Sequence, residues 1–312
     1  MKARVVCIGI ATLDAVVAVD RLPGSDERVE ATDGGLYGGG IAATAAVTLA
    51  RLGVPVAFVG RVGGDAAGRL ISDGLAGEGL DVRGLRLDAK RSPVSAILVE
   101  SPTGLRTLAP FLGGTAPIEL SEADFRACAE ADWVHVDERG LAALPALAAA
   151  GIRTPISVDD GTGRAVIDLA EVALYGPTAR VLRERFPGLA LDDAAAACVA
   201  GGPAIVAATL GAEGSIAASR RADGTVENVR APGFDVAPVS TLGAGDVFHG
   251  ALLAALIDGL ALGTALRFAN AASALSCRAL DGRSAIPNRD ELDAWLATDP
   301  PTRPGLAALG SG

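Results

Sequence analysis

The chain has 312 residues, half of them hydrophobic, and its 27 basic and 37 acidic side chains give a formal net charge of −10. A balance this negative argues against general nucleic-acid binding, which needs a basic surface. Lysine occurs only at Lys2 and Lys90. Neither follows a glycine-rich loop, so the sequence excludes a P-loop and a protein-kinase phosphate lysine.

The apolar segments and the cysteines indicate the cellular compartment of the protein. No segment reaches the roughly 18 apolar residues that a membrane span requires. The cysteines form no CxxC pair, and only two histidines accompany them, so we expect no metal held by a cluster of protein side chains. We therefore expect reduced thiols and a cytoplasmic protein that does not bind membranes. The cysteines and histidines are Cys7, Cys128, Cys198, Cys277, His135 and His249.

In chain order, short runs rich in valine and isoleucine predict buried parallel strands at residues 5–10, 56–59, 133–136, 156–158 and 205–208. Stretches rich in alanine and leucine lie between them and predict helices, among them 42–52, 66–78 and 141–150. This alternation predicts an α/β fold with a doubly wound, mostly parallel sheet flanked by helices.

Two segments break the alternation. Residues 15–37 and 94–111 alternate apolar and polar positions around turns, which predicts hairpin-like strands outside the main sheet. Such strands would form a small β-lid over a site at the carboxyl ends of the early strands. From about Thr241 the chain is predicted to be mostly helical, and the segment 299–312, rich in proline and glycine, is expected to be a flexible tail.

The strongest local signal is Ser240-Thr-Leu-Gly-Ala-Gly-Asp246, which leads into a long apolar run. Two glycines at a helix start leave backbone N–H groups free to bind an anion without a lysine. Asp246 would lie in the first turn of that helix. From the residues alone it is either a capping carboxylate or a general base beside the anion site.

Two further glycine-rich segments follow predicted elements. Residues 38–40 are three glycines before a helix of small residues, which would let a ligand or another backbone approach closely. Residues 208–214 follow a predicted strand and suit a turn into a hairpin equally well. After the first strand, the dinucleotide-binding spacing G-x-G-x-x-G is absent, so a nicotinamide-dependent oxidoreductase is disfavoured.

From Val5 to about Pro287 the chain resembles the ribokinase-type (PfkB) carbohydrate kinases. Their carboxy-terminal signature, D-T-x-G-A-G-D, corresponds to residues 240–246. Their amino-terminal signature is a Gly-Gly pair, an Asn four residues later and a closing Leu-Gly, and it corresponds to Gly39, Gly40, Thr44 and Leu52-Gly53. The resemblance implies a ribokinase-like fold, with residues 1–298 as the kinase domain, and an ATP- and Mg²⁺-dependent sugar kinase.

The resemblance also implies roles for single residues. Asp246 would be the catalytic base, and the amides of Gly243, Ala244 and Gly245 would hold the charge on the transferred phosphoryl group. Sugar contacts would come from one set of positions and nucleotide contacts from another. The implied sugar-side residues are Asp14, Gly39, Gly40 and Thr44, and the implied nucleotide-side residues are Thr209, Gly211 and Asn270.

Three departures from the family pattern change these expectations. Ser240 replaces an aspartate that helps many relatives to hold a monovalent cation, so potassium activation is doubtful. Thr44 replaces the sugar-binding asparagine, so we expect the sugar to differ from ribose. The family's N-x-x-E motif would fall at Pro177-Thr-Ala-Arg180, where neither residue is present, so the organisation of Mg²⁺ is expected to differ.

Three stretches, 38–46, 245–252 and 282–287, look most like the bacterial kinases of 6-deoxy-6-sulfofructose. In that branch an arginine that corresponds to Arg139 is expected to face the sulfonate, and a guanidinium suits a three-oxygen anion. The alternatives are that Arg139 is a solvated loop residue, or that the substrate is fructose, another ketose or a sugar acid. We expect phosphoryl transfer to a primary hydroxyl and a homodimer formed through the lids. A catalytically weak sugar-sensing protein is the remaining alternative.

Overall fold

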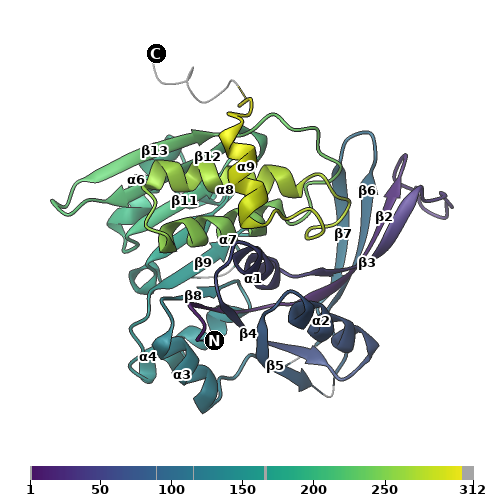
Figure 1. Ribbon diagram of the computed structural model, residues 1–312, viewed down its shortest axis with the longest axis horizontal. Helices are drawn as coiled ribbons and strands as arrows, with labels where there is room; N and C mark the ends of the chain where they lie inside the picture. The colour runs from purple at the N-terminus through teal and green to yellow at the C-terminus, as the bar shows by residue number, and fades with distance from the viewer. Residues whose placement is uncertain (1, 89, 115, 165–166, 304–312) are drawn as a thin grey trace.

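The structure, a computed structural model, describes residues 2–88, 90–114, 116–164 and 167–303. Its largest element is a nine-stranded sheet in the spatial order β13-β12-β11-β10-β9-β8-β1-β4-β5, seen nearly edge-on in Figure 1. Neighbouring strands are parallel, except that β12 runs antiparallel to both β11 and β13. The strands are β1 (Val5–Ile8), β4 (Val56–Gly63), β5 (Asp81–Asp88), β8 (Trp133–Val136), β9 (Ile156–Asp160), β10 (Leu174–Pro177), β11 (Ile205–Thr209), β12 (Gly214–Arg220) and β13 (Val226–Pro232).

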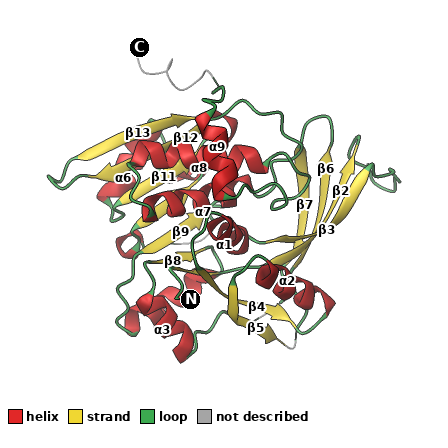
Figure 2. Ribbon diagram, in the orientation of Figure 1, coloured by secondary structure: helices red, strands yellow, loops and turns green. Residues whose placement is uncertain are grey.

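Helices cover both faces of this sheet, as Figure 2 shows. One face packs against α1 (Ile41–Arg51), α2 (Ala66–Gly77), α7 (Ala244–Ile257), α8 (Leu262–Ser276) and α9 (Arg289–Ala297). The other packs against α3 (Glu122–Glu130), α4 (Leu144–Ala149), α5 (Ala179–Arg185) and α6 (Leu191–Ala200). Strand β1 explains the arrangement, because Val5 and Cys7 belong to the first core while Val6 and Ile8 belong to the second. A strand buried on both faces needs an unbroken apolar run.

A second sheet of four strands, the lid sheet, lies beside the main sheet, with the order β3-β2-β6-β7. Its strands are β2 (Thr12–Val19), β3 (Asp33–Gly39), β6 (Val94–Glu100) and β7 (Leu105–Phe111). One face of it packs Val16, Ile97 and Val99 against Leu242 and Leu280 of the main domain. The strands predicted outside the main sheet are therefore found there, and their inner face contacts the glycine-rich loop before α7.

Most predicted elements agree with the structure, and the doubly wound fold is confirmed. The predicted helix at 141–150 is a 3₁₀ turn, Gly140–Ala143, followed by α4, in whose first turn Pro145 lies. A proline is tolerated there because its missing N–H would have no partner in any case. Strands β5, β10, β12 and β13 were not predicted. Among the described residues, no helix is long and apolar enough to cross a membrane.

Residues 299–303, the start of the segment expected to be a tail, are hydrogen-bonded to the end of β13. Thr302 forms a bridge with Phe234, and the amide of Asp235 donates to the carbonyl of Pro301 at 2.9 Å. These backbone hydrogen bonds, together with the packing of Phe234 against Trp295 of α9, hold the segment against the end of β13. The rest of the predicted tail, 304–312, lies outside the described residues.

Candidate active site

The site is placed by the order of strands in the main sheet. Strand β1 lies between β4 and β8, and the chain reaches these neighbours on opposite sides of β1. In doubly wound sheets, ligands bind at the carboxyl ends of the strands where the order reverses in this way. Three loops meet here: the one after β1, the one after β8, and the one before α7.

Asp137, directly after β8, ties these loops together. Its side chain is fully buried and accepts hydrogen bonds from the amides of Ile10 (2.8 Å), Ala42 (3.1 Å), Arg139 (2.8 Å) and Gly140 (3.0 Å). One carboxylate therefore fixes the end of β1, the start of α1 and the loop that carries Arg139. Sequence analysis gave Asp137 no role, although an aspartate directly after a buried strand was a visible signal.

Gly39 and Gly40 lie against Asp14 with no room for side chains. A Cβ on Gly39 would lie 2.0 Å from Oδ2 of Asp14, and one on Gly40 would lie 2.4 Å from the carbonyl oxygen of Ile10. Gly40 also has a φ of 97°, which favours glycine. Asp14 accepts a hydrogen bond from the Thr12 hydroxyl at 2.7 Å, and burial raises its pKa. The predicted sugar-side aspartate and glycine pair are thus brought together.

Thr44 is buried near this glycine pair, and its hydroxyl is hydrogen-bonded to another side chain. Its hydroxyl accepts from Nε of Arg283 at 3.1 Å, and the same guanidinium donates from Nη2 to the carbonyl of Gly39 at 2.6 Å. Arg283 is 8% exposed, and burial lowers its pKa to about 10. The threonine that replaces the family's asparagine therefore anchors an arginine that supports Gly39. Arg283 has no counterpart among the predicted site residues.

The loop before α7 has the geometry of an anion site. Gly243 is the N-cap of α7 with a φ of 71°, and no side chain caps this end. A Cβ on Gly243 would lie 2.9 Å from Cα of Gly282, whereas the position beside Gly245 is open. The start of α7 therefore has open space beside Gly245, where the helix dipole attracts negative charge, while the amide of Ala244 donates to the carbonyl of Thr241 at 3.4 Å. Gly243, Ala244 and Gly245 lie where sequence analysis expected them.

Asp246 lies in the first turn of α7 without capping it. Burial raises its pKa to about 7. Arg106 opposes that rise, Asp137 adds to it, Arg283 opposes it, and Asp14 adds to it. A carboxyl group with a pKa near neutrality is suited to accept a proton from a substrate hydroxyl. The geometry therefore favours the general-base interpretation of Asp246 over the capping interpretation.

Behind Asp246 lies a buried polar pair that sequence analysis missed. Nε2 of His249, one turn further along α7, is 3.6 Å from Oδ1 of Asp159 at the end of β9. Burial lowers the pKa of His249 to about 3 and raises that of Asp159. Oδ2 of Asp159 has no hydrogen-bond partner among the described residues. Gly176 makes room for the imidazole, because a Cβ there would lie 2.3 Å from its Cε1.

The predicted nucleotide-side residues lie beyond the anion site. Thr209 ends β11, and Gly211 follows with a φ of 62° and open space around it. Asn270 on α8 donates from Nδ2 to the carbonyls of Ala231 (3.0 Å) and Pro232 (3.1 Å), and so joins α8 to the end of β13. Gly211 leaves room for a ligand, while the amide nitrogen of Asn270 is used within the protein.

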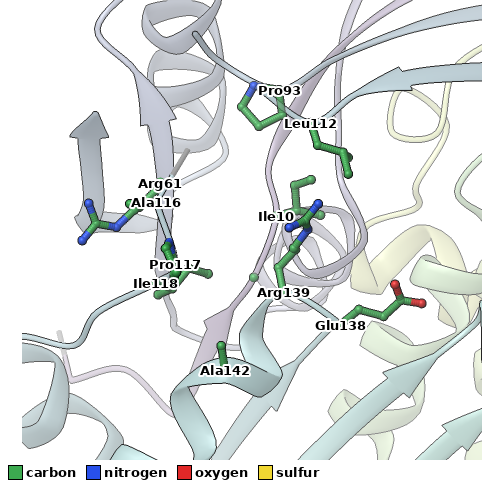
Figure 3. A pocket seen from close by; sticks show the side chains of 11 residues that line it. Ile10, Arg61, Pro93, Leu112, Ala116, Pro117, Ile118, Glu138, Arg139 and Ala142 are labelled. Carbon is green, nitrogen blue, oxygen red and sulfur yellow. The ribbon is translucent and has the colours of Figure 1, made fainter. Parts of the chain in front are cut away.

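A cavity of about 240 Å³ is lined on one side by Gly9 and Ile10, at the end of β1. Arg61 of β4 lies on one wall, while Arg139 and Ile10 lie on the other, and the Glu138 carboxylate points away from Arg61 (Figure 3). Nε of Arg61 is buried without a hydrogen-bond partner. The guanidinium of Arg139 makes no hydrogen bond or ion pair with any residue that the structure describes; only its backbone amide is engaged. The Arg61 guanidinium points away from Arg139 (Figure 3) and lies near Glu119 and Asp88, so Arg139 is the residue whose unpaired charge an anion in this space could meet.

ATP and Mg²⁺ fit these features to different degrees. The open space beside Gly245 could take phosphates, and the open space beside Gly211 could take the rest of a nucleotide. Within the described ranges, no group of three or more histidine, cysteine, aspartate or glutamate side chains is arranged to hold a metal. Mg²⁺ can instead be held by phosphates and water, because it sheds its water reluctantly.

Comparison with known proteins identifies the family. The model of the pfkB family carbohydrate kinases matches residues 2–156 and 183–289. An ATP-dependent ribose-1-phosphate kinase of Halopiger xanaduensis is 30% identical, over 94% of this chain and 98% of its own length. A fructokinase of Klebsiella pneumoniae is 32% identical, over 91% and 97%.

Among solved structures, the ribokinase of Arabidopsis thaliana complexed with ribose and ATP superimposes with a TM-score of 0.79 at 26% identity. The match covers 95% of this chain and 99% of that one. The glycine-rich anion site, the Asp14–glycine pair and Asp246 lie within the span matched by the family model. The chain therefore belongs to the pfkB family of carbohydrate kinases and is an ATP-dependent carbohydrate kinase.

Proposed function

We propose that this kinase transfers the γ-phosphoryl group of ATP to a primary hydroxyl of a ketose-type sugar that carries an anionic group. The first candidate is 6-deoxy-6-sulfofructose, which would give its 1-phosphate. The observation that carries the proposal is the cavity between Arg61 and Arg139, in which the Arg139 guanidinium has no partner among the described residues. Arg139 is exposed at the mouth of this cavity, so its guanidinium is accessible to a ligand, and an arginine fork suits a carboxylate, phosphate or sulfonate.

The cavity adjoins the sugar-side glycines through the protein backbone. Asp137 binds the amide of Ile10, which lines the cavity, and the amide of Ala42, two residues after Gly40. A sugar that lies against Gly39 and Asp14 could therefore extend its far end toward Arg139. Its near end would lie toward Asp246, whose pKa is raised by the charge of Asp14.

In this proposal each group has one task. Asp14 binds a sugar hydroxyl, and Asp246 accepts the proton of the hydroxyl that attacks the γ-phosphorus. The amides at Gly243–Gly245 stabilise the charge on the transferred group. Mg²⁺ bound with ATP would supply positive charge on the β- and γ-phosphates. Thr209, Gly211 and Asn270 remain the predicted nucleotide-side positions.

An acceptor panel tests the proposal. ADP release would be measured with 6-deoxy-6-sulfofructose, fructose, ribose, ribose 1-phosphate and a sugar acid, at equal concentrations and with ATP and Mg²⁺. We expect kcat/KM for the anionic ketose to exceed that for fructose by at least tenfold. A preference for fructose would instead support a fructokinase or ketohexokinase, for which the 32% identity to the Klebsiella fructokinase speaks. ATP binding without turnover of any acceptor would support a sugar-sensing protein.

The assembly and cellular setting complete the proposal. The outer face of the lid sheet exposes large apolar side chains, with Leu36 and Leu105 each 63% exposed and Phe111 44% exposed. We infer that two lid sheets pack together in a homodimer, because a patch of this kind marks an interaction site. Light scattering should then give a dimer mass for the protein and a monomer mass for Leu36→Asp/Leu105→Asp. A monomeric wild-type protein would contradict the inference.

A cytoplasmic location is part of the same proposal. It fits the use of ATP and the four free, buried cysteines. Residues 1–298 would form the kinase domain. We also infer that potassium is not required, because Ser240 is buried and its hydroxyl accepts a hydrogen bond from the amide of Leu242 at 3.1 Å.

A further inference from the structure

Strands β2 and β3 of the lid sheet contact α1 and α2 of the main domain, and the last strand of the lid sheet, β7, lies at its edge nearest the main domain in Figure 1. The register pairs Arg106 with Val99 and Leu108 with Ile97. Val99 and Ile97 are buried in the cluster that includes Leu242 of the glycine-rich loop. Because cross-strand partners share a face of a sheet, the Arg106 side chain lies on the face of β7 turned toward the active site.

Arg106 also contacts the glycine-rich loop directly. Its Nη1 donates a hydrogen bond of 2.8 Å to the hydroxyl of Thr241, which is two residues before the N-cap Gly243. The turn before β7 approaches the same segment, since a Cβ on Gly104 would lie 3.3 Å from the carbonyl oxygen of Val239. The β6–β7 hairpin is therefore seated on the segment that leads into the anion site.

Most N–H donors of the Arg106 guanidinium have no partner among the described residues. An arginine carries five N–H donors, and Arg106 uses one, with no carboxylate at ion-pair distance among the described residues. By contrast, Arg51, Arg86 and Arg230 each pair with a carboxylate. In a chain with two lysines, this arginine brings an uncompensated positive charge to the start of α7.

The positive charge of Arg106 influences the ionisation of Asp246. After the effect of burial, Arg106 has the largest influence on the pKa of Asp246, and it lowers that pKa. Arg283 acts in the same sense but is enclosed by Thr44 and Gly39. Arg106 is therefore the cation near Asp246 with donors free for a ligand.

We propose that Arg106 is a catalytic residue: anchored by Thr241 over the start of α7, its guanidinium contacts the γ-phosphoryl group during transfer. The bond from the γ-phosphorus to the β–γ bridging oxygen breaks, a bond to the acceptor oxygen forms, and Asp246 takes the acceptor proton. Arg106 exchanges no atom and balances the charge of the transferred group. Because Arg106 belongs to the lid sheet, transfer requires the lid to be seated. This proposal rests on the kinase activity and not on the identity of the acceptor.

Kinetics of Arg106→Ala provide the first test. We expect kcat to fall about 100-fold or more, the scale of losing one donor to a transition-state charge, while KM for ATP rises by no more than about tenfold. Arg28→Ala is the matched control, because it removes one exposed lid arginine from the loop between β2 and β3. Arg28→Ala should keep wild-type turnover. Thr241→Val, which loses the anchor but keeps the guanidinium, should lose about tenfold. Wild-type kcat in Arg106→Ala would overturn the proposal.

Binding provides a test that needs no acceptor. By calorimetry with Mg²⁺ present, Arg106→Ala should bind the non-hydrolysable ATP analogue AMP-PNP about tenfold more weakly and bind ADP as the wild type does. Equal weakening for both nucleotides would show a structural role and overturn the proposal. If the wild type phosphorylates no sugar in the panel, the acceptor proposal fails, and this comparison still decides the role of Arg106.

The pH profile gives a readout that a purely structural role would not move. The ionisable groups that influence Asp246 are Arg106 on β7, Arg283 after α8, Asp14 on β2, Asp137 after β8 and Asp159 on β9, besides His249 on α7 itself. Without Arg106 the negative groups prevail, so the acidic limb of kcat/KM should move to higher pH. Arg106→Lys should restore most of the wild-type position. An unmoved limb in Arg106→Ala would contradict the proposal.

Discussion

The two halves of the proposed active site are built by different means. On the phosphoryl side, the backbone amides at Gly243–Gly245 and the dipole of one long helix provide the binding groups, inside the largest core of the molecule. On the acceptor side, separate elements contribute side chains: Asp14 from the lid sheet, Arg61 from β4 and Arg139 from the loop after β8. The reaction is therefore fixed by the fold, whereas the choice of sugar depends on a few replaceable side chains.

The largest effect should come from the residue that joins the two halves. Asp246→Asn keeps the shape of the side chain but cannot accept a proton, so kcat should fall by about 10²–10⁴, the usual contribution of a general base. Because the amides that bind phosphate are untouched, the dissociation constant for ATP should stay within about threefold. Steady-state kinetics and calorimetry would measure the two quantities. Turnover near the wild-type value would remove Asp246 as the base and would leave the two halves without a shared group.

The contrast also explains what the sequence could and could not predict. Gly243 and Gly40 were recognisable because a positive φ or a close approach leaves few alternatives to glycine. Arg283 and Arg106 were missed because their partners, Thr44 and Thr241, lie 239 and 135 residues away in the chain. No local pattern reports such contacts.

The fold shows the same limit. Strands β1 and β8 were predictable as buried apolar runs, since all of β1 and most of β8 is buried. Strand β5 was missed because it lies at the sheet edge, where exposed charged residues such as Arg83 interrupt the apolar pattern. Local sequence thus predicts what the core encloses, and it loses reliability where one face of an element meets water.

The next effect should be confined to the acceptor half. Arg139→Ala should raise KM for the anionic ketose about 10- to 100-fold, because a hydrogen bond to a charged group contributes about 1.5–3 kcal/mol. For fructose the change should stay below about threefold. Arg61→Ala should also raise KM for the anionic ketose more than KM for fructose, but by a smaller factor. The reason is that Arg61 also forms ion pairs with Glu119 at 3.3 Å and with Asp88 at 3.8 Å.

A matched control separates the pocket from overall charge. Arg126→Ala on α3 removes one exposed arginine that does not line the cavity, so both KM values should remain at the wild-type level. Equal increases of KM for anionic and neutral sugars in Arg139→Ala would sink the anion pocket. They would also show that the acceptor half, like the phosphoryl half, positions its ligand without choosing it.

The smallest expected effect is on thermal stability. It tests whether the buried carboxylate of Asp246, on the phosphoryl side, destabilises the folded protein. The pKa of Asp246 is about 7 in the folded chain, above the ordinary aspartate value near 3.9. Between these values the folded state binds more protons than the unfolded state, so this group's contribution to stability falls as pH rises from about 4 to 7. Above pH 7 the carboxylate is ionised in both states and the penalty is fully present. Asp246→Asn removes it, so Tm at pH 8 should rise, by about 1–2 °C for each kcal/mol of penalty removed in a chain of this length.

The pH dependence of that gain is the decisive part. The difference in Tm between Asp246→Asn and the wild type should shrink as pH falls below 7 and be nearly gone at pH 4, where the folded carboxyl is protonated and the unfolded one is about half protonated. Arg126→Ala, which removes an exposed arginine far from Asp246 in the chain, should give a difference that does not depend on pH in this range. A gain that persists at pH 4 would assign the stabilisation to packing and not to charge. The start of α7 would then bear no electrostatic strain, and the raised pKa of the base would need another origin than its burial.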